Sequence, residues 1–319
     1  MRLLILGGTG FLGYHTTRSA LDAGHEVSLF NRGKSRPDEF GEVERLIGDR
    51  VAGDIAALEA VDGLDAVIDC TGYLPSQVKA SAQLLRARSR RYLFVSTISV
   101  YDMGSAEVPI TEDAPLAQMP DGVDESKVSP ETYGPLKVRC EQEARDAFGN
   151  DAVIVRPGLI VGPHDPTDRF TYWVRRGRDG GKILAPGSPQ DRVQVIDGRD
   201  LGAWMVDLAL GEISGVFNGV APPETFGTML EACVVAPDAE VRWIPSEVLI
   251  EAGVEPWQDL PLWVGDAELF VSDARASAAG LVTRPLRETI ADTREWDEQR
   301  GLPELKAGIS REREAELLS

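Results

Sequence analysis

Short apolar runs alternate with longer amphipathic stretches along the first half of the chain. The runs have the length of buried β-strands and lie at residues 3–6, 26–30, 44–47, 66–69, 92–96 and 152–156. The stretches between them have helical periodicity, at residues 11–23, 76–88 and 136–148. Strands that alternate with helices are typical of a parallel sheet, and uninterrupted apolar strands indicate a sheet covered on both faces. The pattern therefore predicts an α/β fold with a doubly wound parallel sheet.

The pattern changes after Pro157. The segment 157–191 is rich in glycine, proline and charge, with one predicted helix near 168–178. We expect residues 193–196 and 216–220 to be strands that return to the main sheet, with a helix at 200–210 between them. The remainder mixes short helices with one strand at 241–244.

This organisation predicts two domains. Residues 1–157 plus about 192–225 should form the domain that contains the sheet. Residues 158–191 plus about 226–319 should form a smaller C-terminal lobe.

A net charge of −19 is the unusual feature of the composition. The 319 residues include 52 Asp and Glu against 33 Lys and Arg. A surface this acidic repels nucleic acid and anionic lipid within a Debye length of about 8 Å. No apolar run approaches the ~20 residues that a membrane span needs. We therefore expect neither a nucleic-acid nor a membrane partner.

Cysteine and histidine usage points to a reducing compartment without a metal site. Cys70, Cys140 and Cys233 are widely separated and form no CxxC pair. The histidines lack metal-ligand spacing. The N-terminal apolar run is too short for a signal peptide. We therefore expect a cytoplasmic protein.

A glycine-rich loop follows the first predicted strand and opens the first predicted helix. It satisfies both GxGxxG and GxxGxxG, with the sequence Gly7-Gly8-Thr9-Gly10-Phe11-Leu12-Gly13. Glycines let the backbone approach a pyrophosphate, whose charge then lies at a helix N-terminus. At this place in an alternating pattern, the loop predicts a dinucleotide-binding site rather than a simple glycine-rich turn.

The end of the second predicted strand lacks the carboxylate of an NAD site. An NAD site places an acidic residue there, about 20 residues beyond the glycines, to bind the ribose 2′-hydroxyl. This chain has Asn31, Arg32, Lys34 and Arg36 instead. Three cations beside an asparagine suit a 2′-phosphate, so we expect NADP in preference to NAD. The alternative is that these are solvated loop charges.

Tyr133 and Lys137 have the YxxxK spacing that places two side chains on one face of a helix. A cation about 5 Å from a phenol favours its anion by roughly 3 kcal/mol, or on the order of two pKa units. The pair therefore predicts a tyrosine acid/base. The alternative is a surface ion pair between Lys137 and Glu141. Gly134 and Pro135 disfavour helix, so we expect the helix to start or kink there.

Together these features resemble the extended short-chain dehydrogenases/reductases of the NAD-dependent epimerase/dehydratase family. The matching segments follow the family's order along nearly the whole chain: residues 7–13, Gly48-Asp49-Arg50, Asp69-Cys70-Thr71-Gly72, residues 96–101, Tyr133 to Lys137 with Glu141, Arg156-Pro157-Gly158, Gly162-Pro163, Asp197, Asp200-Leu201, Gly280-Leu281 and Arg284-Pro285-Leu286. The resemblance implies a Rossmann nucleotide-binding domain and a substrate-binding C-terminal lobe.

The resemblance also implies a catalytic triad of Thr97, Tyr133 and Lys137. Tyr133 would exchange a proton with the substrate, while Lys137 would hold the nicotinamide ribose and lower the pKa of Tyr133. Hydride would pass between a substrate carbon and the nicotinamide. Besides the glycine loop and the cations, the implied cofactor contacts are Asp49 and Arg50 near the adenine, and Cys70, Thr71, Gly72 and Pro157.

We expect the substrate contacts to come from residues near the ends of the strands and from the second lobe. The first candidates are Tyr73, Ser99, Arg169 and Arg192, and further ones are His164, Asp165, Trp173, Trp257 and Trp263. Aromatic residues and arginines also fill lobe interfaces and pair with acids, so a purely structural role is the alternative for each.

Two departures from the family pattern narrow the activity. The fourth strand is followed by Asp-Cys-Thr-Gly rather than the commoner His-Leu-Ala-Ala type, which argues against the best-known epimerases. The sequence Thr97-Ile98-Ser99 replaces the Thr-Asp-Glu of the 4,6-dehydratases, so dehydration is disfavoured.

We interpret the chain as an NAD(P)-dependent dehydrogenase or reductase that acts on a hydroxyl or carbonyl of a small metabolite. The alternatives are a nucleotide-sugar epimerase and a non-catalytic relative of stem-loop RNA-binding proteins. The oligomeric state, with a homodimer as one option, is left open.

Overall fold

The computed structural model describes residues 1–265 and 270–319, and these residues form two compact units. Unit 1 consists of Met1–Gly158, Gly198–Val220 and Val271–Val282. Unit 2 consists of Leu159–Asp197, Ala221–Phe270 and Thr283–Ser319. Each unit has its own buried hydrophobic core.

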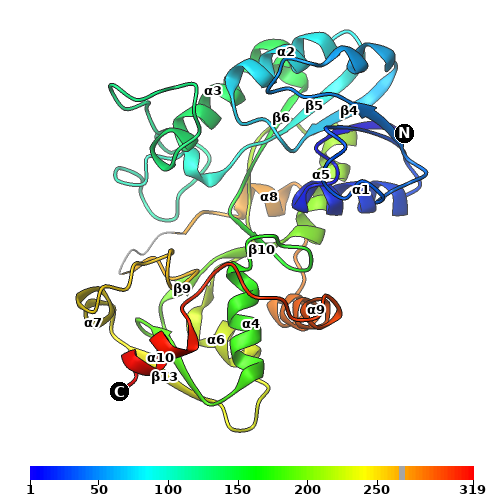
Figure 1. The fold of residues 1–319 in the computed structure, drawn as a ribbon. Helices are drawn as coiled ribbons and strands as arrows, with labels where there is room; N and C mark the ends of the chain where they lie inside the picture. Colours follow the sequence, from blue (N-terminus) through cyan, green and yellow to red (C-terminus); the bar gives the residue numbers. More distant parts are fainter. Residues whose placement is uncertain (266–269) are drawn as a thin grey trace. The chain divides into compact units, whose positions relative to one another are not determined.

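A parallel sheet forms the centre of unit 1 (Figure 1). Among the described residues it has seven strands in the order β11-β6-β5-β4-β1-β2-β3, and all neighbours are parallel. The strands are β1 (Arg2–Leu6), β2 (Glu26–Asn31), β3 (Glu44–Ile47), β4 (Leu64–Asp69), β5 (Ser89–Val95), β6 (Ala152–Pro157) and β11 (Gly215–Gly219). The chain moves outward from β1 first to one side and then to the other. The predicted doubly wound α/β fold is confirmed.

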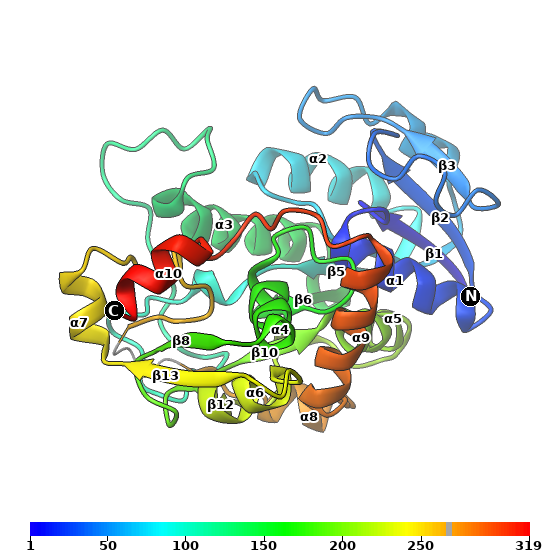
Figure 2. The same cartoon turned by 60° about the horizontal axis from the view of Figure 1, so that its bottom comes forward.

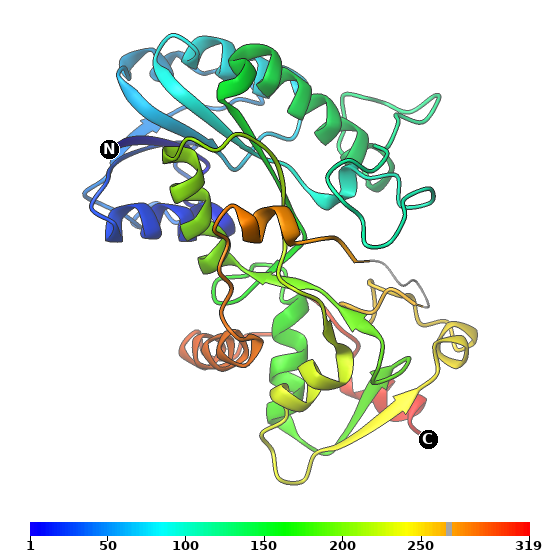
Figure 3. The same ribbon diagram turned by 180° about the vertical axis from the view of Figure 1, so that it is seen from behind.

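Helices cover both faces of this sheet (Figures 1 and 3). Helix α1 (Phe11–Asp22) packs beside α5 (Gly198–Leu210) on one face, and α2 (Pro75–Leu85) packs beside α3 (Pro130–Phe148) on the other. A Cβ on Gly202 would lie 2.8 Å from the backbone nitrogen of Thr16, so the glycine allows α5 to approach α1. The shorter elements are the 3₁₀ turns η1 (Ala56–Ala60), η2 (Ile98–Val100) and η3 (Gly149–Asp151), and helix α8 (Ala274–Ala278). Because both faces are covered, the loops at the carboxyl edge are left to form a ligand site.

Helix α3 begins at Pro130, earlier than the sequence pattern predicts. Ser129 and Thr132 form a capping box: the Ser129 Oγ accepts from the Thr132 backbone, and the Thr132 Oγ1 accepts from the Ser129 backbone at 2.8 Å. Pro130 takes the first helical position, where no N–H is needed. The helix then continues through Pro135 to Phe148, so of the two expectations at Gly134 and Pro135 the start is wrong, and a kink stays a prediction.

The prediction that residues 193–196 return to the main sheet is also wrong. Strand β9 (Arg192–Val193) pairs with β12 (Glu224–Thr225), and β10 (Val195–Asp197) pairs with β7 (Leu159–Val161). At this end of the main sheet, β11 rather than residues 193–196 pairs with β6, from Val153 to Pro157. The predicted strand at 216–220 does join the main sheet, as β11.

The grouping of segments into units differs from the expected domain boundaries in three places. Residues 192–197 and 221–225 belong to unit 2, while residues 271–282 belong to unit 1. Long-range contacts hold residues 271–282 in unit 1. The Trp204 Nε1 donates to the carbonyl of Ala279 at 3.0 Å, and the Asn218 Nδ2 donates to that of Ser272 at 3.2 Å. Short sequence-local patterns carry no trace of such contacts.

Unit 2 consists of helices and short strands (Figure 2), and aromatic side chains lie in its core. Strand β8 (Lys182–Pro186) pairs in parallel with β13 (Glu240–Ile244). The helices are α4 (Arg169–Asp179), α6 (Phe226–Cys233), α7 (Ser246–Glu251), α9 (Leu286–Gln299) and α10 (Arg311–Leu317). Trp173 is fully buried, with its ring edge-on to Phe226. Trp173 and the buried Trp263 therefore belong to the core, contrary to their prediction as substrate contacts.

In the described part of the chain, no helix combines the length and apolar character that crossing a membrane requires.

Candidate active site

A pocket of about 480 Å³ opens in unit 1 at the carboxyl edge of the sheet. The sequence-predicted residues that line it are Gly7, Thr9, Gly10, Asn31, Arg32, Lys34, Asp49, Arg50, Thr71 and Tyr73. They come from the loops after β1, β2, β3 and β4, which parallel pairing brings to one edge.

Eight further lining residues were missed by sequence reasoning, and they are Phe30, Gly33, Ser35, Gly48, Val51, Leu74, Gln77 and Val128. Gly33, Ser35 and Gly48 lie inside or beside motifs already singled out, so their proximity was a usable signal. Leu74, Gln77 and Val128 belong to no motif, and only the folded chain brings them here.

Other predicted cofactor contacts lie outside the lining of this pocket and stay predictions: Phe11, Leu12, Gly13, Arg36, Cys70, Gly72, Tyr133, Lys137 and Pro157. The Arg36 guanidinium lies 4.9 Å above the ring of Tyr14, on α1. The Phe11 ring is edge-on to His15. Burial raises the pKa of the Cys70 thiol to about 12, so it is protonated at neutral pH.

The glycine loop packs too tightly for side chains at most of its positions. Gly7 has φ +87°, which favours glycine. A Cβ on Gly13 would overlap the backbone of Gly7, and one on Gly8 would lie 2.5 Å from Leu29. Gly10 differs, because its nearest neighbour would lie 3.5 Å away and its φ is −72°. Gly10 lines the pocket, so its backbone can be approached there by a ligand.

The N-terminus of α1 is open to an anion. No side chain of the described chain caps it, and its first turn carries no acidic residue. The N–H groups of a first helical turn have no partner within the helix, and the helix dipole adds partial positive charge there. This end of α1 can therefore bind a phosphate oxygen.

The loop after β2 presents polar donors to the pocket. The Asn31 Oδ1 accepts from the Gly33 backbone at 2.8 Å, while the solvent-shielded Asn31 Nδ2 has no hydrogen-bond partner among the described residues. Arg32 and Lys34 are exposed and line the same pocket. A buried amide without a partner indicates a missing acceptor, such as a ribose hydroxyl or a phosphate oxygen.

Arg50 lines the pocket, but its guanidinium binds the protein rather than pointing freely into the space. It donates to both carboxylate oxygens of Asp69, at 2.7 and 2.8 Å. It also donates to Ser81 and Thr71, each at 3.0 Å. Because its four terminal N–H groups are used in this way, Arg50 could contact an adenine, as the sequence analysis expects, only through its Nε or the side of its aliphatic chain.

Tyr133 and Thr97 form a hydrogen bond in unit 1, and Lys137 lies one turn after Tyr133 on α3, so the triad stays a prediction. Thr97 follows β5, and Tyr133 lies in the first turns of α3. Gly134 permits this meeting, because a Cβ there would overlap the carbonyl oxygen of Ser99. A glycine that looks unsuited to a helix is thus required by the close approach of α3 to the end of β5.

The pKa of Tyr133 is raised, not lowered as the sequence analysis expects. Burial raises it, and a hydrogen bond with Thr97 acts in the opposite direction. Lys137 is not among the groups that act on this pKa. In unit 1 as folded, the Tyr133 phenol is therefore protonated at neutral pH and ready to donate a proton.

Lys137 is buried, with 3% of its surface exposed. Its Nζ donates to the carbonyls of Gly72 and Val95, both at 2.7 Å, and lies 4.1 Å from the ring centre of Phe94. An ammonium has three N–H donors, so these bonds leave one for a further acceptor. Burial lowers the pKa of Lys137 to about 8.

The alternative pairing of Lys137 with Glu141 is wrong. Glu141 is buried and accepts from Arg156 at 2.7 and 2.8 Å, and from Ser96 at 2.6 Å. Arg156 also donates to the Tyr101 hydroxyl at 3.0 Å. This network ties the ends of β5 and β6 to α3 and so supports the position of the triad. A charged residue within an otherwise apolar strand was the signal for it.

The low pKa of Lys137 predicts how stability changes with pH. The unfolded chain binds the Lys137 proton up to pH 10.5, but the folded chain loses it near pH 8, so stability rises with pH between these values. At 1.36 kcal/mol per pH unit, the full effect is about 3 kcal/mol. We expect the free energy of unfolding of wild type, relative to Lys137→Met, to increase by up to that amount from pH 7 to pH 10.5. Urea unfolding across this range measures it, and a difference that does not change with pH would contradict the lowered pKa of Lys137.

Among the substrate candidates, Tyr73 and Ser99 lie in unit 1 near the triad. The Lys137 Nζ lies 5.7 Å from the ring centre of Tyr73, which is 47% exposed. Burial raises the pKa of the Tyr73 hydroxyl. The Ser99 Oγ accepts from the Thr97 hydroxyl at 3.2 Å. Both side chains can therefore contact a ligand that reaches Tyr133.

Arg169 and Arg192 lie in unit 2, each above an aromatic ring. The Arg169 guanidinium lies 5.1 Å from the ring centre of Trp257, and that of Arg192 lies 4.6 Å from Phe270. Such stacking holds the cation at the surface and leaves its edge free for an anion.

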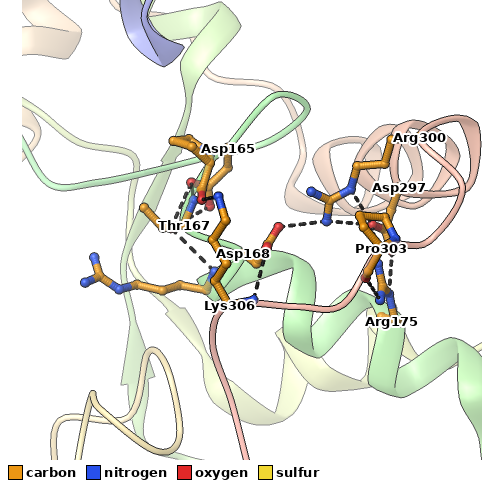
Figure 4. A network of polar contacts seen from close by, with 10 residues as sticks. Asp165, Thr167, Asp168, Arg175, Asp297, Arg300, Pro303 and Lys306 are labelled. Atoms are coloured by element: carbon orange, nitrogen blue, oxygen red, sulfur yellow. Dashed lines mark hydrogen bonds and ion pairs between the residues drawn. The ribbon is translucent and has the colours of Figure 1, made fainter.

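The loop before α4 is held by acidic side chains (Figure 4). The Asp168 carboxylate accepts from Arg300 at 2.7 Å and from the Lys306 backbone at 3.2 Å. The buried Asp165 accepts from the backbone and hydroxyl of Thr167, and burial raises the pKa of Asp165. Asp165 therefore shapes the loop, rather than serving as the exposed substrate contact that the sequence suggests.

Comparison with known proteins places these features in context. Residues 3–216 match the model of the NAD dependent epimerase/dehydratase family. The chain is 26% identical over 267 residues to the chloroplast stem-loop binding protein of 41 kDa b of Arabidopsis thaliana, across 77% of this chain and 67% of that protein. It is 30% identical over 238 residues to the 2-alkyl-3-oxoalkanoate reductase of Stenotrophomonas maltophilia, across 66% of each.

The fold is similar to that of the Bordetella bronchiseptica enzyme WbmH, solved in complex with NAD+. The TM-score is 0.68 and the identity 17%, across 94% of this chain and 99% of that one. The two curated relatives are thus matched over about two thirds of their length, and this structure over almost all of it.

Proposed function

This chain belongs to the NAD-dependent epimerase/dehydratase family, and from this premise we propose that it is an NADP(H)-dependent reductase or dehydrogenase. Its substrate would be a small metabolite with a hydroxyl or carbonyl group. The observation that carries the proposal is the hydrogen bond between Tyr133 and Thr97, with Lys137 buried one turn further along α3, in the unit whose glycine loop lines the pocket. The similarity to a reductase over two thirds of the chain supports the same class of reaction.

The residues around the pocket fit a phosphorylated dinucleotide. The uncapped N-terminus of α1 and the open side of Gly10 would hold the pyrophosphate. The unpartnered Asn31 amide and the cations Arg32 and Lys34 would hold the ribose 2′-phosphate. When bound, the nicotinamide supplies or accepts the hydride.

The side chains of the triad would handle the proton and the orientation of the substrate. The protonated Tyr133 hydroxyl would donate to the carbonyl oxygen of a substrate under reduction, or receive its proton in the reverse direction. Thr97 would orient that oxygen beside the phenol. The Lys137 ammonium, fixed by two carbonyls, would place positive charge behind the site and offer its third N–H to a ribose hydroxyl.

We propose that the two units bind different molecules. Unit 1 would bind the dinucleotide and carry the triad, and unit 2 would bind the substrate through the stacked cations Arg169 and Arg192. A planar guanidinium suits a carboxylate or phosphate group on the substrate.

The cofactor preference is tested at Arg32. We expect wild type to bind NADP+ more tightly than NAD+, because Arg32 can form a charge-assisted hydrogen bond to the 2′-phosphate. Such a bond is worth about 1.5–3 kcal/mol, or roughly 10–150-fold in affinity, and the exposure of Arg32 favours the lower end. Arg32→Ala should remove that preference and leave NAD+ affinity unchanged in calorimetric titrations.

Arg145→Ala is the matched control, because Arg145 is an exposed arginine in the last turn of α3 that does not line the pocket. Equal or tighter binding of NAD+ by wild type would refute the preference for NADP. An unchanged NADP+ affinity in Arg32→Ala would reject Arg32 as its source.

The similarity to a stem-loop binding protein raises RNA binding as the alternative function. We expect such binding to be weak, because a net charge of −19 opposes the approach of a polyphosphate. Filter binding of a stem-loop RNA at low salt is the measurement, since low salt favours the electrostatic attraction. Tight binding that weakens steeply with added salt would support the alternative instead.

A further inference from the structure

We propose that the buried ion pair between Arg50 and Asp69 is the positioning element for Lys137 and for the glycine loop. This inference rests on the proposed function, in which Lys137 and that loop serve a bound dinucleotide. It assigns Arg50 to positioning, where sequence analysis expects direct contact with the adenine.

The pair is buried and fully engaged. The side chain of Arg50 is 6% exposed and that of Asp69 is fully buried. The four terminal N–H groups of Arg50 serve Asp69, Ser81 and Thr71. Asp69 also accepts from the Tyr92 hydroxyl at 2.8 Å and from the Thr71 backbone at 3.0 Å.

The pair fixes the loop after β4 from both sides. Arg50 comes from the loop after β3, Asp69 ends β4, and Ser81 lies in α2. Thr71 is held twice, at its backbone by Asp69 and at its hydroxyl by Arg50. The loop therefore has one position relative to three elements, rather than the freedom of a surface loop.

Two functional groups depend on that position. The carbonyl of Gly72, the next residue, accepts from the Lys137 Nζ at 2.7 Å. The methyl group of Thr71 packs where a side chain on Gly7 would lie, so the position of Thr71 also fixes how the glycine loop packs. A shift of this loop would loosen both the ammonium and the phosphate-binding turn.

Arg50 and Asp69 both keep their charge although they are buried. Burial opposes the charge of each partner, but the contact with Asp69 raises the pKa of Arg50, and the contact with Arg50 lowers the pKa of Asp69. Both partners therefore stay ionised across the working pH range. Asp69 favours and Arg50 disfavours the charged form of Lys137, so removing both charges together leaves mainly a geometric effect on Lys137.

The primary test removes both charges while keeping polar groups, in Arg50→Gln/Asp69→Asn. The chain has only six lysines, so ¹³C NMR of lysine Cε can follow Lys137, assigned by the missing signal in Lys137→Met. In wild type this signal should titrate near pH 8. In the double variant its midpoint should move further below the ordinary lysine range, because the ammonium loses its bond to the Gly72 carbonyl, and affinity for NADP+ should fall about tenfold or more.

The matched control is Arg176→Gln/Glu314→Gln. This pair is an equally buried arginine–carboxylate pair, and it lies in unit 2. Its loss should lower thermal stability without changing the Lys137 titration or NADP+ affinity. Because the double variant at Arg50 can fail to fold, Thr71→Val provides a milder test that keeps the side-chain shape and removes only the bond from Arg50.

The outcomes separate the two proposals. A folded Arg50→Gln/Asp69→Asn or Thr71→Val protein with wild-type Lys137 titration and wild-type NADP+ affinity would overturn the positioning role. Wild type that fails to bind either dinucleotide would overturn the proposed function, while the Lys137 titration would still report on positioning. The same changes in the Arg176 control would mean a general effect of lost stability and would also overturn the inference.

Discussion

Tyr133→Phe is expected to lower turnover by about 10²–10⁴-fold, the range typical of a lost general acid–base group. The phenylalanine ring keeps the packing of α3 against the end of β5, so dinucleotide affinity should stay at the wild-type level. Because burial raises the pKa of Tyr133, the phenol acts as the acid at neutral pH. Reduction of a carbonyl should therefore be retained at neutral pH and lost only under strongly alkaline conditions.

The measurement is a screen of aldehydes, ketones and 3-oxo acids with NADPH, followed through the absorbance of the reduced nicotinamide. The best substrate of wild type is then used for the variants. Tyr172→Phe is a matched control, since it removes a buried phenol from unit 2. A Tyr133→Phe enzyme with near-normal turnover and an unchanged pH profile would exclude Tyr133 as the acid.

Gly13→Ala and Gly10→Ala are expected to separate folding from binding within one loop. A Cβ on Gly13 would overlap the Gly7 backbone, so α1 must move away from the loop after β1. Overpacking of this kind costs about 1–3 kcal/mol of stability. Loss of even one charge-assisted bond to the pyrophosphate weakens binding by roughly 10–150-fold.

Gly10→Ala should leave thermal stability close to wild type, because its new methyl group has ordinary contacts and an allowed φ. Because Gly10 lines the pocket, we expect the added methyl group to hinder the approach of a pyrophosphate, so dinucleotide affinity should still fall. Gly41→Ala is the control, as its Cβ would lie 3.9 Å from the nearest atom and away from the pocket lining. Thermal melting and calorimetric titration give the two readouts. Full NADP+ affinity in Gly10→Ala would exclude the loop as the pyrophosphate site.

The sequence by itself determined the sheet and most of the nucleotide-binding edge. A buried strand appears in the sequence as an apolar run of strand length, whatever its partners are. Six strands of the main sheet were therefore predicted close to their observed bounds. Parallel pairing then places the residues that follow each strand at one edge. Gly7 and Asn31 could therefore be expected at one pocket, while Asp49 and Thr71 were expected there from the family resemblance.

Sequence patterns were weaker where a residue's neighbour lies far along the chain. Residues 193–196 have the composition of a strand, but whether they join the main sheet depends on β11, which occupies the edge of β6. Gly134 was expected to weaken the helix, whereas the folded chain needs it to bring Tyr133 to Thr97. Local propensity cannot report a contact with Ser99, 35 residues earlier.

The partners of the charged residues were decided only by the tertiary structure. From the spacing along the helix, Glu141 was the expected partner of Lys137. From the family resemblance, Arg50 was expected to contact the adenine. In the folded chain Glu141 binds Arg156, Lys137 binds two carbonyls, and Arg50 binds Asp69. A buried charge takes whichever partner can offset its lost hydration, and that choice depends on three-dimensional proximity rather than on spacing along the chain.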